Sequence, residues 1–246
     1  FNHHEYYRYL NCGYKLPLVG GTDKMSSDVP VGIYRTYAKI GVGQEFTYDT
    51  WCKAVTAGRT VHSGGPMLTF SVDGHEIGDT VALPGNGGTV EVAAETECIF
   101  PTHCLQVVQE GKVVAEASEP TGARKLNLKA KVKVEGHSWL AARVAGPRYE
   151  SIPHYDGWGR GIFAHTSPVY IACGGEWWMF DQETATYMLT LVDGCVEYIR
   201  NASRLHTEET VTHHHGEPDH QEYLERPFLE AREAIHKRMH QLRVPH

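Results

Sequence analysis

The sequence lacks the short motifs that would assign a function directly. It has no P-loop and no G-x-S-x-G nucleophile elbow, and "GVG" at 41–43 lacks the third glycine and the preceding strand of a dinucleotide site. No apolar run approaches the roughly 18 residues that a membrane-spanning helix needs. The first residues, "FNHHEYYRYL", do not resemble a signal peptide. Because the chain does not begin with methionine, its location, cytoplasmic or exported, stays open.

An excess of positive charge is also missing. Lysine and arginine number 23 against 30 aspartates and glutamates, which gives a formal net charge of −7. A surface of this sign repels the phosphates of a nucleic acid and the headgroups of an anionic membrane. We therefore expect neither a nucleic-acid partner nor a membrane partner.

Cysteines are present, but not in a pattern that builds a site. The six cysteines show no C-x-x-C spacing, so neither a zinc knuckle nor a disulfide scaffold is indicated. Free and mostly buried thiols are the expectation. Cys98 and Cys104, which flank "IFPTH", are the one pair placed to close a short loop.

What the chain does contain is enough apolar sequence for one large domain or two smaller ones: 246 residues, of which 41% are hydrophobic. Its composition changes along the chain in three zones. Residues 1–66 alternate between strand-like and helical stretches, residues 67–172 read as strands joined by glycine turns, and residues 173–246 are helical and rich in histidine and glutamate.

The middle zone carries the clearest strand pattern. In "KLNLKAKVKV", Lys125–Val134, apolar residues fall on one face and lysines or asparagine on the other without exception. "TVEVAAE" at 89–95 repeats the alternation, so antiparallel pairing would set glutamates opposite lysines on the solvent side. Turn signals at 73–74, 84–88 and 110–111 recur at strand-length intervals. The zone therefore predicts an antiparallel β-sandwich of about seven or eight strands.

Three helices are expected around this module. Residues 46–58 predict a helix with Thr47 as its N-cap and Gly58 at its end, whose apolar face makes Trp51 a buried anchor against the segment Leu16–Val19. Residues 184–201 predict a second helix. A third has apolar residues spaced by three and four over 228–242, with Pro227 in its first turn.

The stretch "LPLVGGTDKM", Leu16–Met25, ends an apolar run on a carboxylate. Leu16–Val19 followed by two glycines and Asp23 is the pattern of a parallel strand that enters a loop at its carboxyl end, where ligands and metals gather in α/β folds. Glycines allow close approach of the backbone to a ligand, and a carboxylate is a hard donor for a divalent cation. Aspartate is also a favoured helix N-cap, so both interpretations of Asp23 stay open.

Three stretches together resemble the C-terminal part of the CehA/McbA-type metallohydrolases, a branch of the polymerase-and-histidinol-phosphatase (PHP) superfamily. They are "YYRYLNCGYKLPLVGGTDKM" at 6–25, "WCKAVTAGRTVHSGGPMLTFSVDG" at 51–74 and "AHTSPVYI" at 164–171. The resemblance implies an α+β chain. The C-terminal end of a distorted (β/α)7 barrel would occupy residues 1–66, and a β-sandwich and a helical C-terminal segment would follow.

The same resemblance implies a divalent metal ion, which is zinc, manganese or iron, held partly by Asp23. Met25 stands where the wider superfamily often has a histidine, so one ligand is missing or supplied elsewhere. The barrel's early His-x-His motif would lie before Phe1. The chain then resembles a fragment without a complete active site, whose partner is the remaining N-terminal part of the protein or another copy in a homo-oligomer.

In this interpretation the intact protein hydrolyses a small-molecule ester-like, carbamate or phosphoester bond with a metal-activated water, whose pKa falls from near 16 to about 7 in favourable cases. The catalytic residues themselves stay unknown. The rival hypothesis is a non-catalytic β-sandwich that binds a sugar polymer or a partner protein, with Asp23 only as a cap.

Two histidines within the resembling stretches are candidate cleft or substrate contacts. His62 lies in "TVHSGGP" and His165 in "AHTSPVYI". The alternative for His62 is an ordinary polar loop residue, and for His165 a structural residue held by backbone partners. "WGRG" at 158–161 is a candidate aromatic loop over a pocket.

The remaining histidines predict no designed metal site. His3 and His4, if on a strand, would point to opposite faces and could not reach one ion together. The cluster at 213–215, with His206 and His220 nearby, lies in a polar connector without two ligands at fixed spacing on one element. We expect adventitious metal uptake there.

Overall fold

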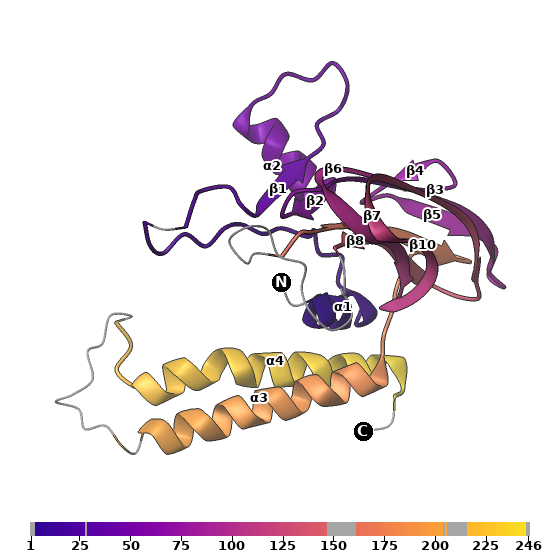
Figure 1. Ribbon diagram of the computed structural model, residues 1–246. Helices are drawn as coiled ribbons and strands as arrows, with labels where there is room; N and C mark the ends of the chain where they lie inside the picture. Colours follow the sequence, from indigo (N-terminus) through magenta and orange to yellow (C-terminus); the bar gives the residue numbers. More distant parts are fainter. Residues whose placement is uncertain (1–2, 28, 147–160, 204, 206–215, 245–246) are drawn as a thin grey trace. The chain divides into compact units, whose positions relative to one another are not determined.

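The computed structural model describes residues 3–27, 29–146, 161–203, 205 and 216–244 (Figure 1). The chain falls into two compact units, residues 1–179 and 180–246, and each is described by itself. The division expected from the sequence, at 66/67 and 172/173, remains a prediction. No helix in the described ranges combines the length and the apolar character needed to cross a membrane.

The first unit is built mainly of strands. Its elements, in chain order, are α1 (His3–Asn11), β1 (Arg35–Ala38), α2 (Tyr48–Thr56), β2 (Thr60–Ser63), β3 (Met67–Val72), β4 (His75–Glu76), β5 (Thr80–Leu83), β6 (Gly88–Gln109), β7 (Lys112–Val134), β8 (Ser138–Ala145), β9 (Phe163–Thr166) and β10 (Val169–Cys173).

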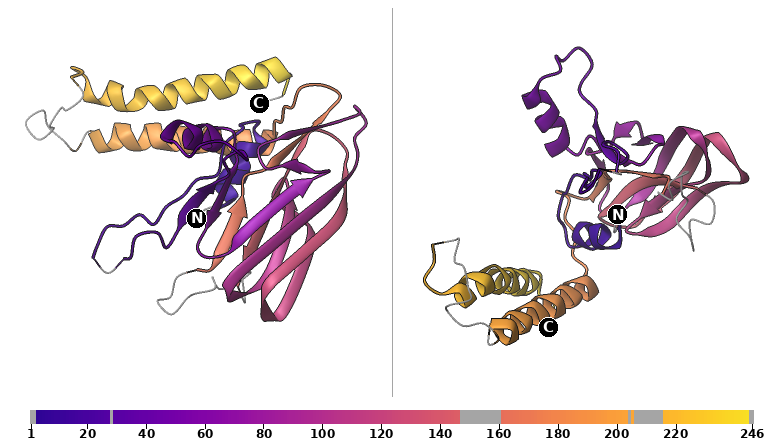
Figure 2. Two further views of the ribbon diagram at one scale, coloured as in Figure 1. Left: turned by 90° about the horizontal axis from the view of Figure 1, so that it is seen from above. Right: turned by 60° about the vertical axis from the view of Figure 1, so that its left-hand side comes forward.

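The ten strands found in the described ranges belong to one sheet. Its main order is β1-β2-β9-β8-β6-β3-β4, with β7 paired to β6 and β10 paired to both β8 and β5. β5 and β10 run parallel, and the other described pairs are antiparallel. The sheet folds over on itself, because β3 packs across the core against β8 and β9, with neither of which it pairs. Figure 2 shows the long β6–β7 ribbon bending over the shorter strands.

This architecture corrects the fold predicted from the resemblance. A (β/α)7 barrel end requires parallel strands alternating with helices, whereas β1 and β2, both from residues 1–66, are antiparallel and continue the sheet formed by the later strands. Leu16–Val19 lies outside every strand. The predicted sandwich is also wrong in one respect, since its strands form one curved sheet instead of two separate ones.

The core lies inside the curve of the sheet. Alternate residues of each strand point into it, which is what period-two patterning of a half-buried strand requires. Its members include Phe70 of β3, Val92 and Leu105 of β6, and Ile171 of β10. Both halves of β6 contribute, on either side of the register shifts between Glu97 and Cys104. The bent strand β6 thereby connects the part of the sheet that contains β3 with the part that contains β8 and β9.

The strand predicted at Lys125–Val134 is confirmed as the second half of β7. Leu128 and Val132 are buried and Lys131 is exposed, as expected, whereas Leu126 is only half-buried. The expected opposition of charges is present too. Lys131 lies 3.7 Å from the carboxylate of Glu91 directly across the pair.

The helix predicted at 46–58 is confirmed as α2, but Trp51 is not a core anchor. Thr47 forms the N-terminal capping box, and Gly58, at φ +70°, follows the last turn. Trp51 is 37% exposed, and Ala54 is the buried residue of the helix. The reason is the support: α2 lies against the four-residue β1, which is too narrow to cover an indole.

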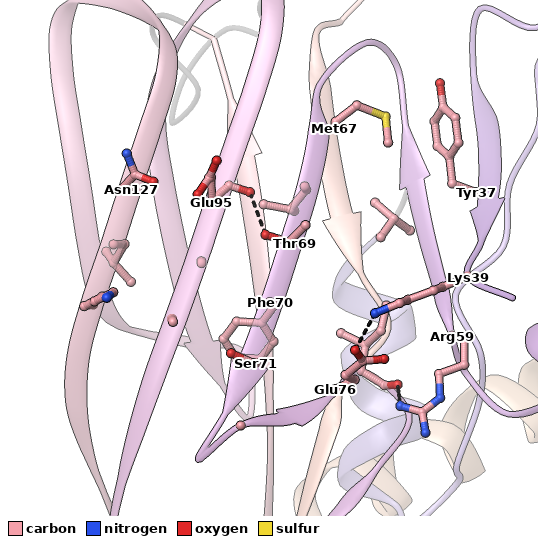
Figure 3. Close-up of a pocket in the computed structure, with 18 of the residues that line it drawn as sticks. Tyr37, Lys39, Arg59, Met67, Thr69, Phe70, Ser71, Glu76, Glu95 and Asn127 are labelled. Carbon is pink, nitrogen blue, oxygen red and sulfur yellow. Dashed lines mark hydrogen bonds and ion pairs between the residues drawn. The ribbon is translucent and has the colours of Figure 1, made fainter. Parts of the chain in front are cut away.

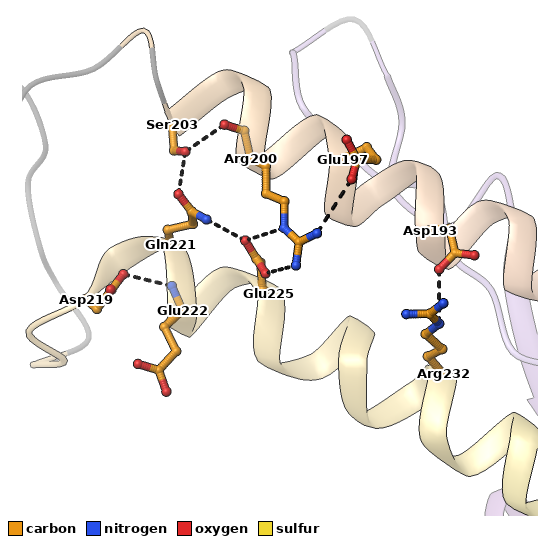
Figure 4. Close-up of polar contacts among 9 residues, drawn as sticks. All are labelled: Asp193, Glu197, Arg200, Ser203, Asp219, Gln221, Glu222, Glu225 and Arg232. Carbon is orange, nitrogen blue, oxygen red and sulfur yellow. Dashed lines mark hydrogen bonds and ion pairs between the residues drawn. The ribbon is translucent and has the colours of Figure 1, made fainter.

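The described part of the second unit is a pair of helices, α3 (Gln182–Ser203) and α4 (His220–Leu242). The range predicted for α3 is nearly correct, whereas α4 extends eight residues further toward the N-terminus than predicted. Glu225 of α4 accepts two hydrogen bonds from the Arg200 guanidinium of α3, at 3.1 and 2.9 Å (Figure 4). These bonds hold the pKa of Glu225 below its ordinary value. The prediction for Pro227 is wrong, because α4 begins earlier, behind the N-cap Asp219.

Candidate functional site

The three stretches on which the resemblance rests meet at one buried place, which we call the junction. The Leu18 amide, from the first stretch, donates to the Ser167 hydroxyl of the third at 2.9 Å. That hydroxyl shares a 2.7 Å hydrogen bond with Thr60 of the second. All three residues are at most 3% exposed. The junction therefore fixes where the segment that leads to Asp23 crosses the sheet.

His62 and His165 lie side by side at the junction. They are directly opposite each other in the β2–β9 pair, so their side chains emerge on the same face. The His62 ring is 4% exposed and lies against the backbone of Gly20, where a Cβ would come within 2.2 Å of its Cε1 atom. Burial lowers the pKa of His62. The glycine expected to bring the backbone close to a ligand brings it close to an imidazole.

His165 is a link in a chain of hydrogen bonds. Its Nδ1 lies 2.7 Å from the Thr166 carbonyl oxygen and its Nε2 lies 2.7 Å from the Tyr7 hydroxyl. A carbonyl only accepts, so Nδ1 carries the proton and Nε2 accepts from Tyr7. The Arg143 guanidinium donates to the Tyr7 oxygen at 3.5 Å. This order of donors assigns one neutral tautomer to His165.

Electrostatics agree with a neutral imidazole. Burial lowers the pKa of His165 to about 3 and raises that of Tyr7 to about 12. Neither group changes its protonation near neutral pH. His165 is 2% exposed, and in this position it supports the fold, while a substrate contact by His165 or His62 remains only a prediction.

Asp23 lies beyond the junction, on an extended segment outside helices and strands. Its carboxylate is exposed, and its backbone has φ +49°. No residue in the described part of the chain makes a hydrogen bond or ion pair with this side chain. The N-cap interpretation is wrong, since the next helix, α2, begins only at Tyr48. A metal-binding role remains a prediction.

Two threonine hydroxyls hold the segment on either side of Gly21. Thr36 of β1 accepts from the Gly20 amide and donates to the Gly20 carbonyl, both at 2.8 Å. Thr22 donates to the Tyr34 carbonyl at 3.1 Å and accepts from the Gly32 amide at 2.9 Å. Hydrogen bonds from these threonine side chains take the place of the backbone hydrogen bonds of a strand pair. They hold Thr22, the residue before Asp23, in position.

These residues do not complete a metal site. Within the described ranges, no group of three or more histidine, cysteine, aspartate or glutamate side chains is close enough to hold an ion. Met25 is 85% exposed. The described residues therefore offer one carboxylate ligand at most, and a metal at Asp23 would need the rest from elsewhere.

None of the other candidates that the structure describes forms a metal site with Asp23. His3 and His4 lie on α1, not on a strand, with ring centroids 4.2 Å apart, and burial lowers the pKa of His3 to about 4. Cys98 and Cys104 are both buried, and no disulfide joins them. The cluster at 213–215, His206 and most of the loop at 158–161 lie outside the described residues, and His220 is the first residue of α4.

A groove of about 710 Å³ lies on a different face, between β1–β2 and the outer side of β3, β6 and β7 (Figure 3). Tyr37 and Met67 face each other at one end. The other end is closed by the ion pair of Lys39 with Glu76 and by that of Arg59 with Asp79, the latter at 2.6 Å.

Sequence reasoning found Asp23, His62 and His165 but missed the residues that hold them. Tyr7 and Ser167 lie within the quoted stretches, so their presence there was the one available signal. No local sequence pattern indicated the hydrogen bonds of Thr22 and Thr36 or the groove, because the residues involved come together only in the folded sheet.

Comparison with known proteins does not identify the chain. No family model matches it, and no curated protein matches it either. One partly similar solved structure is the CARDB domain of the PF1109 protein from Pyrococcus furiosus, crystallised in complex with di-metal ions. Its identity is 16% and its TM-score 0.27, over 44% of this chain and 96% of that one. At that score the likeness carries no argument about fold, metal or function.

Proposed function

We propose that this chain is part of a metal-dependent hydrolase in which Asp23 provides one carboxylate ligand. The remaining ligands come from outside the described residues. The substrate is a small molecule with an ester-like, carbamate or phosphoester bond. The observation that carries the proposal is Asp23 itself: an exposed carboxylate without a described partner, on a non-glycine residue in the left-handed region. Such strain persists where the surroundings impose it, and it clusters at functional sites.

The surroundings of Asp23 do impose it. Thr22 is fixed by its hydroxyl to the backbone of Tyr34 and Gly32, and Gly20 is fixed by Thr36. Further back, Leu18 is buried and bonded to Ser167. A segment held at three successive points presents its next side chain in a defined direction, which a metal ligand requires.

The chemistry of the donor supports a hard divalent cation. Carboxylate oxygens suit magnesium, calcium and manganese, and they also complete zinc and iron sites. One carboxylate is not a site, so the described residues alone do not fit a bound metal. The proposal therefore assigns to this chain one coordination position and the scaffold that holds it.

A matched pair of substitutions tests the proposal. Asp23 and Asp73 are both exposed aspartates in the left-handed region, at φ +49° and +47°. Asp23→Asn and Asp73→Asn keep the side-chain shape and tolerate the same backbone. Both would be made in the longest natural polypeptide that contains this chain. Bound metal would be counted by mass spectrometry, and hydrolysis followed with 4-nitrophenyl acetate, 1-naphthyl methylcarbamate and bis(4-nitrophenyl) phosphate.

We expect Asp23→Asn to lose metal and to lose about 100-fold or more in rate, because a lost ligand costs at least as much as a lost supporting residue. Asp73→Asn should keep both. An Asp23→Asn protein with full metal content and full rate would end the proposal. The rival role, in which the module binds a sugar polymer or a partner protein, would then stand on the groove alone.

A further inference from the structure

One edge of β3 has no partner strand over most of its length. β3 pairs with β6 along all six of its residues. On its other side it pairs with β4, but only at Ser71 and Val72. Over residues 67–70 the second edge of β3 therefore faces no other strand of the described chain.

The register identifies the backbone groups at this open edge. The Asp73 amide donates to the Glu91 carbonyl at 2.8 Å, which continues the β3–β6 register by one residue. Hydrogen-bonded pairs alternate in an antiparallel ladder. Met67, Thr69 and Ser71 accordingly direct their backbone groups to β6.

Leu68 and Phe70 direct theirs to the open edge. The turn after β3 agrees with this assignment: Asp73 and Gly74 both have positive φ, as in a two-residue type I′ hairpin, so the flanking Val72 bonds to His75 on the β4 side. Val72 belongs to the same alternate set as Leu68 and Phe70. Each of these two residues thus offers one N–H and one C=O beside the groove.

These groups lie where water has little access. Leu68 is 3% exposed and Phe70 is 6% exposed. Backbone polar groups removed from water are nearly always hydrogen-bonded, because leaving them unpaired is costly. A partner from outside the described residues would satisfy them.

The groove beside this edge is where the two ends of the sheet approach without pairing. The sheet order begins with β1 and ends with β3 and β4, and both ends line the groove. Lys39 and Glu76 join them at one end by an ion pair, while Tyr37 and Met67 border the other end without one (Figure 3). Within the described residues, the sheet is therefore an incomplete barrel that is open along β3.

We propose that this groove receives an extended segment of a partner protein, which pairs with Leu68 and Phe70 and adds a strand to β3. Strand addition of this kind takes its affinity from main-chain hydrogen bonds. Residues 67–70 span about 13 Å, enough for four residues of an extended chain. Because the two edge residues are recessed, two copies of the chain cannot pair these edges with each other.

The walls specify the chemistry of the segment. Val61 and Ile77 line the groove on the core side and favour apolar side chains there. The charges at the closed end, on Lys39 and Arg59, are already paired with Glu76 and Asp79. An uncharged segment with alternate apolar residues and no proline fits best. This inference is independent of any metal at Asp23.

Hydrogen exchange on the full chain gives the first test. In the free protein, the amides of Leu68 and Phe70 should exchange faster than those of Thr69 and Ser71, which bond to β6. Adding the probe peptide acetyl-Val-Thr-Val-Thr-Val-amide should slow the first two by about tenfold or more and leave the second two unchanged. Equal protection of all four amides in the free protein would overturn the assignment of an open edge.

Peptide affinity, measured by calorimetry, gives the second test. The same peptide N-methylated at every amide cannot donate from its main chain and should not bind. Thr69→Trp fills the groove floor and should weaken binding about tenfold or more, whereas Thr89→Trp, also at an exposed strand position but outside the groove, should leave it within about twofold. Trp is a favoured strand residue, so both variants should fold. No binding of the unmodified peptide, or equal binding of both peptides, would refute the proposal.

Discussion

Removing the Tyr7 hydroxyl should destabilise the first unit by about 2 kcal/mol. Tyr7→Phe keeps the ring, which packs at 5.0 Å from Trp139, and deletes the donor to the His165 Nε2 atom. A buried acceptor that loses its donor costs about 1–3 kcal/mol. The second contact of this hydroxyl, from Arg143 at 3.5 Å, is too long to add much.

Urea denaturation followed by tryptophan fluorescence measures this loss, since Trp139 is fully buried beside the substituted ring. A loss of about 2 kcal/mol corresponds to a melting temperature lower by about 4–8 °C for a unit of this size. Tyr9→Phe on the same helix is the control, because Tyr9 is 44% exposed and should change stability by no more than about 0.5 kcal/mol. If Tyr7→Phe were as stable as Tyr9→Phe, the directed hydrogen-bond chain through His165 would be refuted.

Two further predictions concern the same junction. The pKa of His165 is about 3 in the folded state, whereas an unfolded histidine titrates near 6.5. Between these pH values the unfolded state binds more protons than the folded state. The contribution of His165 to the free energy of unfolding should therefore be complete above pH 6.5 and should fall by up to about 1.4 kcal/mol per pH unit as the pH decreases. Denaturation at pH 7 and pH 5 measures this loss, and His165→Gln should lose less; an equal loss would contradict the buried neutral imidazole. Gly20→Ala should lower the free energy of unfolding by about 1–3 kcal/mol, because its Cβ would meet the His62 ring. Gly21→Ala is the control and should lower it less, because a Cβ there meets nothing within 4 Å. Equal melting temperatures of the two variants would show that the His62 ring does not pack against Gly20.

Local structure could be predicted well for helices and strands that have one face exposed to solvent and the other face buried. The alternation at Lys125–Val134 could form only a half-buried strand, and the cap at Thr47 fixed the start of α2. Alternation does not tell whether a strand bends from one layer into another. For that reason a single folded sheet, joined through β6, was mistaken for two sheets.

The errors at Leu16–Val19 and Trp51 share a physical cause. A short apolar run before two glycines describes a parallel strand, but it equally describes an extended segment with one buried side chain, and only Leu18 is buried here. The apolar face of α2 indicated that something lies beneath it without indicating how wide that support is. Both outcomes depend on which distant segments pack against these residues. The sequence around Leu18 does not indicate that Ser167 binds it, and the sequence of α2 does not indicate that β1 supports it.

The junction itself could be predicted only in part. His62 and His165 were identified through the stretches that contain them, but their pairing requires knowing that β2 and β9 are neighbours. The groove was missed entirely, because β1 and β3 lie at opposite ends of the sheet order and no local pattern connects them.

The β6–β7 ribbon has a consequence for the order in which the first unit folds. Its turn at Glu110 and Gly111, both with positive φ, joins strands whose first pair is Gln109 with Lys112, so the ribbon can zip from contacts close in sequence. The parallel pair of β5 with β10 joins Thr80 to Tyr170 and must close a long loop first. Long-range pairs of this kind form slowly. The β6–β7 ribbon should therefore form first, and the amides of the β5–β10 pair should be the last to gain protection from hydrogen exchange during refolding.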